Sequence, residues 1–107
     1  MKFVIFVIDD RSNSADENEM AAIDQFNDSL QKNGHWIYAC GIVDSSKAMM
    51  IDFRGNNHLI KNESINTGSD FISGFWIIEA TDQVQAKDLA KKASHACNRR
   101  VELRAQL

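Results

Sequence analysis

The chain has 107 residues, of which 44% are hydrophobic and 25% are charged, and its net charge is −3. These values predict one folded domain over residues 1–107 and exclude a disordered chain or a disulfide-rich scaffold. The basic residues are scattered, and no apolar stretch approaches the roughly 18 residues of a membrane span. We therefore expect a cytoplasmic protein with neither nucleic acid nor a membrane as partner.

The first half of the chain predicts a strand, a helix and a second strand. Residues 2–8 are rich in Val, Ile and Phe and too short for a stable helix, which favours a central strand. A helix is expected to begin at the capping box of residues 14–17 and to end at Gly34 in a left-handed conformation. The aromatic and β-branched residues 36–42 then predict a strand. The apolar stripe of the helix would consist of Met20, Ile23, Phe26 or Asn27, and Leu30.

The middle of the chain predicts a hairpin arm. Residues 48–53 and 58–61 are short apolar runs, and the turn between them carries a Gly-Asn pair, which is a hairpin signal. Residues 62–70 contain Ser, Asn, Thr and Gly in close succession, and we expect an ordered loop or an irregular strand there.

The last third of the chain predicts a strand, a helix and a strand. Residues 71–80 give the strongest strand pattern, in which Gly74 permits a bulge or the close approach of another backbone. Residues 99–105 alternate strictly, as in a strand with one buried side formed by Val101 and Leu103. Between them, residues 82–96 predict a helix whose small buried face includes Ala86, Leu89, Ala90, Ala93 and Cys97.

This order of elements predicts an α+β fold of the ferredoxin-like βαββαβ plan with an antiparallel sheet and an extra hairpin arm. Two helices cover one face of such a sheet. Trp36, Tyr38, Phe75 and Trp76 supply more large apolar surface than one helix layer would hide. A domain of this size also buries only about 60–70% of its unfolded surface, so a second subunit would add stability. We therefore expect a homodimer in which a second sheet packs against the first.

A family pattern is carried by the run from Gly74 to Ala80, by Gln85-Ala86 in the helix that follows, and by the closing strand from Arg100 to Arg104. It extends upstream to a first strand that ends in Asp9-Asp10, a helix with Phe26-Asn27 and Leu30, then Gly34 and the strand to Gly41. Over nearly its whole length the chain thus resembles the DGPF branch of the YCII-related family. In that branch the pattern is Gly-Gly-Phe-Trp-Leu-Ile-Asp-Ala, a helix with Glu-Ala, and a Val-Glu-Val-Arg strand; Ser73 stands at the first Gly. The resemblance implies a dimeric α/β barrel.

The motif that names the branch is not preserved here. Asp-Gly-Pro-Phe aligns with Asn62-Glu63-Ser64-Ile65, and the Thr-Lys-Glu that follows aligns with Gly68-Ser69-Asp70. Because the family's Asp is a possible acid or base near the cleft, its loss means that an activity is not implied by the resemblance. Asn62, at the position of that Asp, becomes a candidate ligand-binding residue.

Two residues are candidate catalytic groups. His35 lies directly before the second strand, where it is either a general base beside an aromatic pocket or a polar residue of a helix-to-strand turn. Glu79 ends the strongest strand, and it is either a buried carboxylate with a raised pKa or a residue exposed by the end of the sheet.

The candidate ligand-binding residues include three aromatic side chains. Trp36, Tyr38 and Trp76 would line an apolar cleft. Arg54, at the tip of the arm, is either a clamp for a ligand carboxylate or an exposed or intersubunit ion-pair partner.

No metal site or cofactor is predicted. Cys40 and Cys97 lack CxxC spacing, and we expect both to be reduced residues of the core. His35, His58 and His95 lie far apart and form neither HxH nor HExxH.

Two functions fit these features. The first is a homodimer that binds a small, mostly apolar molecule in a cleft of the barrel. The second is a cofactor-free lyase or isomerase that moves a proton on a small carbonyl or aromatic-ring compound, with His35 or Glu79 as the base. A purely structural partner of another protein would instead keep a large exposed apolar patch after dimerisation.

Overall fold

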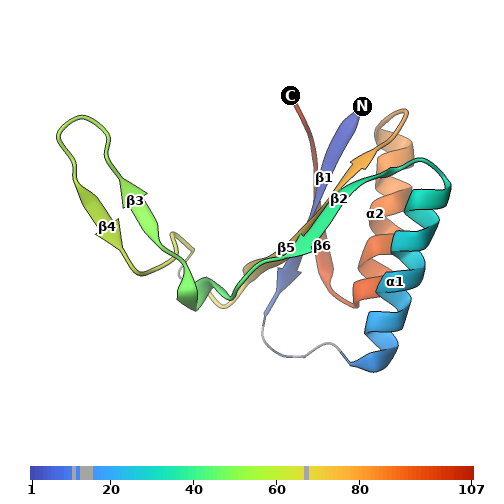
Figure 1. Cartoon of the computed structure of the whole chain (residues 1–107), viewed down its shortest axis with the longest axis horizontal. Helices are drawn as coiled ribbons and strands as arrows, with labels where there is room; N and C mark the ends of the chain where they lie inside the picture. Colours follow the sequence, from blue (N-terminus) through green and yellow to red (C-terminus); the bar gives the residue numbers. More distant parts are fainter. Residues whose placement is uncertain (11, 13–15, 67) are drawn as a thin grey trace.

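The structure is a computed structural model, and it describes residues 1–10, 12, 16–66 and 68–107. The order of helices and strands is the predicted one (Figure 1). The elements are β1 (Lys2–Asp9), α1 (Glu17–Lys32), β2 (Trp36–Gly41), the short 3-10 helix η1 (Ser45–Lys47), β3 (Met50–Asp52), β4 (Leu59–Lys61), β5 (Phe71–Glu79), α2 (Gln83–Cys97) and β6 (Arg100–Ala105).

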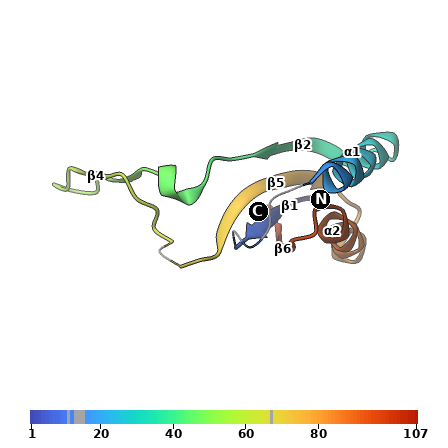
Figure 2. The same ribbon diagram turned by 90° about the horizontal axis from the view of Figure 1, so that it is seen from below.

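Four of the strands form one antiparallel sheet in the order β2-β5-β1-β6. This is the ferredoxin-like arrangement, in which the first and third strands of the βαββαβ plan lie in the centre of the sheet. Here those two strands are β1 and β5. Figures 1 and 2 show both helices on the same face of the sheet. The predicted α+β class and the single helix layer are therefore confirmed. The other face of the sheet, which we call the open face, has no helix over it among the described elements.

The core lies between the helices and the sheet. Phe3 and Ile5 of β1 point toward the helices and are fully buried, and Leu30 of α1 is buried against them. The small predicted face of α2 is buried throughout, and Val101 and Leu103 of β6 face the core as expected. Small residues on α2 allow the helix to approach the sheet closely.

The start of α1 differs from the prediction. The side chain of Asp16 accepts a hydrogen bond from the Glu19 amide at 2.9 Å, so Asp16 is the N-cap. Ser14, the expected cap, lies outside the described residues. The Asp-x-x-Glu pattern of residues 16–19 satisfies the same capping rule two residues later.

Within the described part of the chain, no helix is long and apolar enough to cross a membrane.

The predicted apolar stripe of α1 is wrong at one position. Phe26 and Leu30 are buried and Ile23 packs against the core, but Met20 is exposed. Met20 lies in the first turn of the helix and lines a pocket there. At the other end of the helix, Gly34 has φ +76°, which is the expected left-handed conformation.

The structure confirms both roles predicted for Gly74, the bulge and the close approach of another backbone. The pairing register between β1 and β5 shifts after Val7, so that Ser73 is an extra residue of β5 with no partner on β1. A Cβ atom on Gly74 would lie 2.8 Å from the carbonyl oxygen of Cys40 on the neighbouring strand. The position therefore combines a β-bulge with a close backbone approach.

The hairpin arm projects away from the sheet (Figure 1). Its two strands are shorter than expected, and Ile51 lies directly opposite Ile60. Ile51, Phe53 and Ile60 share one side of the ribbon and are 62%, 55% and 58% exposed; we call this side the arm face. Outside residue 67, the segment from 62 to 70 forms neither helix nor strand, which agrees with the predicted loop.

A candidate ligand pocket beneath helix α1

A pocket of about 420 Å³ lies between α1 and the edge of the sheet formed by β2 and β5. Its volume falls within the range of small-molecule sites, roughly 300–1,000 Å³. Helix α1 contributes Ile23 and Asn27, and the strands contribute Trp36, Ala39 and Trp76. The walls are therefore mainly apolar, with one amide group.

The position of Trp36 in this pocket depends on a second irregularity of the sheet. Trp36 pairs with Ile78 and Tyr38 pairs with Ile77, so Ile37 is an extra residue of β2. The bulge shifts the alternation of β2 side chains between the two faces of the sheet, so that Trp36 and Ala39 both pack on the helix side. Ala39 lies opposite Trp76, and its small side chain leaves the space that the pocket occupies.

Tyr38 does not join the two tryptophans. It is exposed on the open face, with its ring centroid 6.2 Å from that of Phe75. Strict alternation would have placed Trp36 and Tyr38 on the same side, and the bulge at Ile37 separates them. The structure brings together Trp36 and Trp76 of the three predicted aromatic residues.

Trp76 is held rigidly in the pocket wall. Its indole Nε1 donates a hydrogen bond to Oδ1 of Asn27 at 2.7 Å. Its ring meets that of Phe26 edge to face, with centroids 5.4 Å apart. Both contacts join β5 to α1, so the wall is already in place without a ligand.

A charged cluster lies at one end of the pocket. The Arg99 side chain is only 10% exposed, and its guanidinium lies 3.4 Å from an oxygen of Asp9 and 3.6 Å from an oxygen of Glu19. Asp9 and Arg99 are among the residues that line the pocket. The sequence analysis did not predict this cluster, because its three members come from β1, α1 and the turn between α2 and β6.

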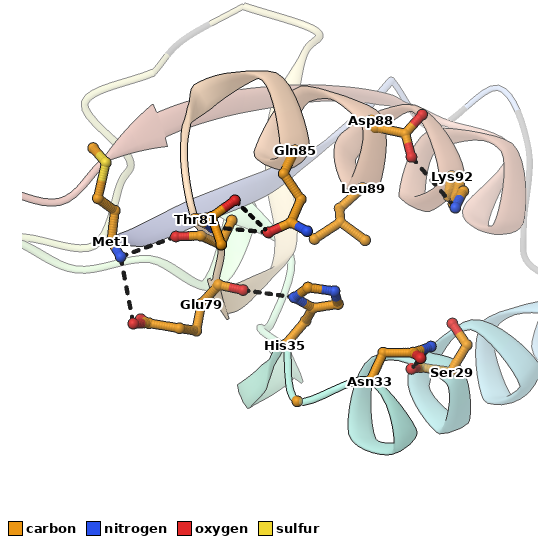
Figure 3. A pocket seen from close by; sticks show the side chains of 12 residues that line it. Met1, Ser29, Asn33, His35, Glu79, Thr81, Gln85, Asp88, Leu89 and Lys92 are labelled. Atoms are coloured by element: carbon orange, nitrogen blue, oxygen red, sulfur yellow. Dashed lines mark hydrogen bonds and ion pairs between the residues drawn. The ribbon is translucent and has the colours of Figure 1, made fainter.

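His35 and Glu79 lie in a different groove, of about 740 Å³, between the C-terminal end of α1 and the start of α2 (Figure 3). Nδ1 of His35 is 2.9 Å from the backbone carbonyl oxygen of Glu79. Because a carbonyl only accepts, Nδ1 carries the proton, and Nε2 is the acceptor of the neutral ring. None of the described residues lines both this groove and the pocket beneath α1.

The carboxylate of Glu79 is half exposed, so the interpretation as a buried acid is wrong. Glu79 is the last residue of β5, and the end of the sheet leaves its side chain in solvent, as the alternative interpretation held. The amino group of Met1 lies 3.4 Å from Oε1 of Glu79. The remaining wall of the groove is largely polar and includes Gln85, Asp88 and Lys92.

Arg54 and Asn62 line neither of these two sites. Arg54 is exposed at the arm tip, where its Nε and Nη2 donate hydrogen bonds to Oδ1 and Oδ2 of Asp52 at 3.0 and 2.8 Å. Its guanidinium thus binds a carboxylate of its own arm. Asn62 is exposed just after β4.

The Asp52 carboxyl gives a pH-dependent prediction. The hydrogen bonds from Arg54 lower the pKa of Asp52 from 3.8 to about 2. A depressed pKa means that the interaction supports the arm tip above pH 3.8 and is lost as the pH falls through about 2. An NMR titration of the Asp52 carboxyl carbon should show a midpoint near 2, and Arg54→Met should raise it toward 3.8.

Lys61→Met is the matched control for this titration, because Lys61 pairs with Glu63 at 3.8 Å and not with Asp52. Its midpoint for Asp52 should equal that of the wild type. A wild-type midpoint at the ordinary value of 3.8 would contradict the ion pair.

The two cysteines are free. Cys97 is buried as expected, and burial raises the pKa of its thiol, which disfavours the reactive thiolate. Cys40 is only half-buried, because it lies beside the pocket. Among the described residues, no three His, Cys, Asp or Glu side chains are placed to hold a metal ion.

The fold and the site together define a class of small ferredoxin-like α+β domains with an aromatic pocket beneath the first helix and an open sheet face. The chain belongs to the YCII-related domain family, whose model matches residues 1–104. The resemblance to the YCII-related family that was inferred from the sequence is therefore confirmed. A search of curated proteins found no match.

Proposed function

We propose that this YCII-related domain binds a small, mostly apolar molecule in the pocket beneath α1. The observation that carries the proposal is the pair of tryptophans, Trp36 and Trp76, in the wall of a 420 Å³ space. The hydrogen bond between Trp76 and Asn27 holds that wall in place before a ligand enters. A preformed apolar pocket with few polar groups is the usual form of a small-molecule site.

We further propose that the protein is a homodimer of the dimeric α/β barrel type, with a second copy on the open face. Central strand β1 and its neighbour β5 carry partly buried apolar side chains there, paired across the two strands. A contiguous apolar patch of this kind is typical of a protein interface. The open face consists of Val4, Phe6, Ile8, Ile72, Phe75, Ile77 and Tyr38.

The exposed area supports this second copy. A compact monomer of 12.1 kDa should expose about 6,000 Å². This chain exposes 7513 Å². The excess of about 1,500 Å² exceeds the roughly 800 Å² that each partner buries in a standard interface. A dimer interface of at least standard size on each subunit would therefore bury about half of this excess or more.

The arm face supports the same partner. A two-stranded hairpin is marginally stable by itself in water, and this one exposes Ile51, Phe53 and Ile60 on one side. We propose that the arm packs against the second copy, which would cover these residues.

Proton transfer in the groove of His35 is the second candidate function. Nε2 of His35 is available as a base there, since Nδ1 donates its hydrogen bond to the backbone carbonyl oxygen of Glu79. However, the tryptophans that would hold a ring compound lie in the other pocket, and the carboxylate of Glu79 is solvated. These positions favour binding over catalysis. If a substrate is found, unchanged turnover by His35→Ala and by Glu79→Gln would rule out this function.

A thermal-shift screen against a library of uncharged apolar compounds tests the binding proposal. Ligands of the pocket should raise Tm, because binding at 100 times Kd adds about 2.7 kcal/mol to stability. Ala39→Phe fills the pocket and should abolish the ligand-induced shift, whereas Ala21→Phe on the exposed side of α1 should keep it. The proposal fails if no compound raises Tm, or if Ala39→Phe responds as the wild type does.

A further inference from the structure

The Asn27 amide is the pocket's distinctive polar group, and its orientation is fixed. Nε1 of Trp76 carries a hydrogen and can only donate. The atom of the Asn27 amide that lies 2.7 Å from it must therefore be the oxygen. The usual ambiguity between the oxygen and the nitrogen of an amide is removed here by chemistry.

The amide nitrogen is left for another partner. Within the described residues, the side-chain NH2 of Asn27 makes no hydrogen bond, while Asn27 itself is half-buried and lines the pocket. Ile23, Trp36 and Ala39, which line the same pocket, carry no side-chain acceptor. A ligand that buries this group has to supply an acceptor, since an unpaired buried donor is costly.

We infer that the ligand is a carbonyl compound, whose oxygen accepts from the side-chain NH2 group of Asn27 and whose apolar body lies against Trp36. The inference rests on the proposed function, because it names the ligand class of the same pocket. Trp76 acts as a positioning residue that turns the donor side of Asn27 toward the ligand.

The experiment compares two probes of the same shape, 1-indanone and 1-methyleneindane, which differ only in C=O against C=CH2. Dissociation constants come from NMR titrations that follow the indole N–H signals of Trp36 and Trp76. The measured quantity is the ratio of the two constants, methylene over ketone, in each variant. Asn27→Asp keeps an oxygen for Trp76 but replaces the NH2 by a second acceptor.

The ratio should fall on the order of 3- to 10-fold in Asn27→Asp, which is the effect of one hydrogen bond. Asn18→Asp makes the same charge change on the exposed first turn of α1 and should leave the ratio unchanged. Trp76→Phe gives a second route if Asn27→Asp does not fold. Without the indole N–H the amide can turn, and the ratio should fall in this variant too.

The outcomes distinguish a failure of the carbonyl inference from a failure of the proposed binding function. If both probes move the indole signals but the ratio stays the same in Asn27→Asp, the carbonyl inference is overturned and the pocket remains a binding site. If neither probe moves either indole signal up to its solubility limit, the inference and the proposed function both fail.

Discussion

Replacing Ile77 by glutamate is expected to convert a dimer into a monomer. Ile77 lies on the open face, paired with Val4 on one side and with Tyr38 on the other. In the proposed dimer a carboxylate at this position would be buried without a partner, and the desolvation cost of such a charge is several kcal/mol. Light scattering should give about twice the 12.1 kDa of one chain for the wild type and one chain mass for Ile77→Glu.

Val84→Glu is the matched control for this experiment. Val84 lies near the start of α2 and is 78% exposed, so the same kind of charge there should leave the dimer intact. A wild-type protein that scatters as a single chain would contradict the barrel proposal. So would an Ile77→Glu variant that stays dimeric.

Replacing Gly74 by alanine should lower the free energy of unfolding by about 1–3 kcal/mol, which is the usual cost of overpacking. The new Cβ would meet the carbonyl oxygen of Cys40 at 2.8 Å and the Cα of Gly41 at 3.2 Å. Both are backbone atoms of β2, which cannot turn away as a side chain would. Denaturant unfolding followed by fluorescence measures the change.

Gly41→Ala provides the control on the facing strand. Its Cβ would lie 3.6 Å from the carbonyl oxygen of Ser73, which is ordinary contact. We expect unfolding within about 0.5 kcal/mol of the wild type, as for most substitutions away from tightly packed features. Equal losses for Gly74→Ala and Gly41→Ala would mean that the close approach does not limit the sheet.

The periodic spacing of apolar residues was sufficient to predict the helices and strands. Each helix buries one side over several turns, and each strand of the main sheet buries one side over several residues. It also predicted the role of Gly74, since a glycine inside a strong strand pattern marks a bulge or a close approach. The stripe of α1 left Phe26 and Asn27 as alternatives. The structure uses both, with Phe26 in the core and Asn27 in the pocket wall.

The site was harder to predict because it depends on irregularities and on distant pairs. The bulge at Ile37 moves Tyr38 to the opposite face of the sheet from Trp36. The two-residue alternation of side chains that is assumed for a strand in a sequence does not reveal such a bulge. The hydrogen bond between Asn27 and Trp76 joins residues 49 positions apart. The same holds for Arg99, whose carboxylate partners come from β1 and α1.

The most direct test of the central claim, a ligand pocket beneath α1, is a ¹H–¹⁵N NMR screen that follows the two indole N–H signals. The protein has two tryptophans, Trp36 and Trp76, and both line the pocket. Compounds that raise Tm should shift both signals, with a saturable dependence on concentration. If those compounds leave both indole signals in place and shift the backbone signals around His35 instead, the ligand site is the other groove and the account is wrong.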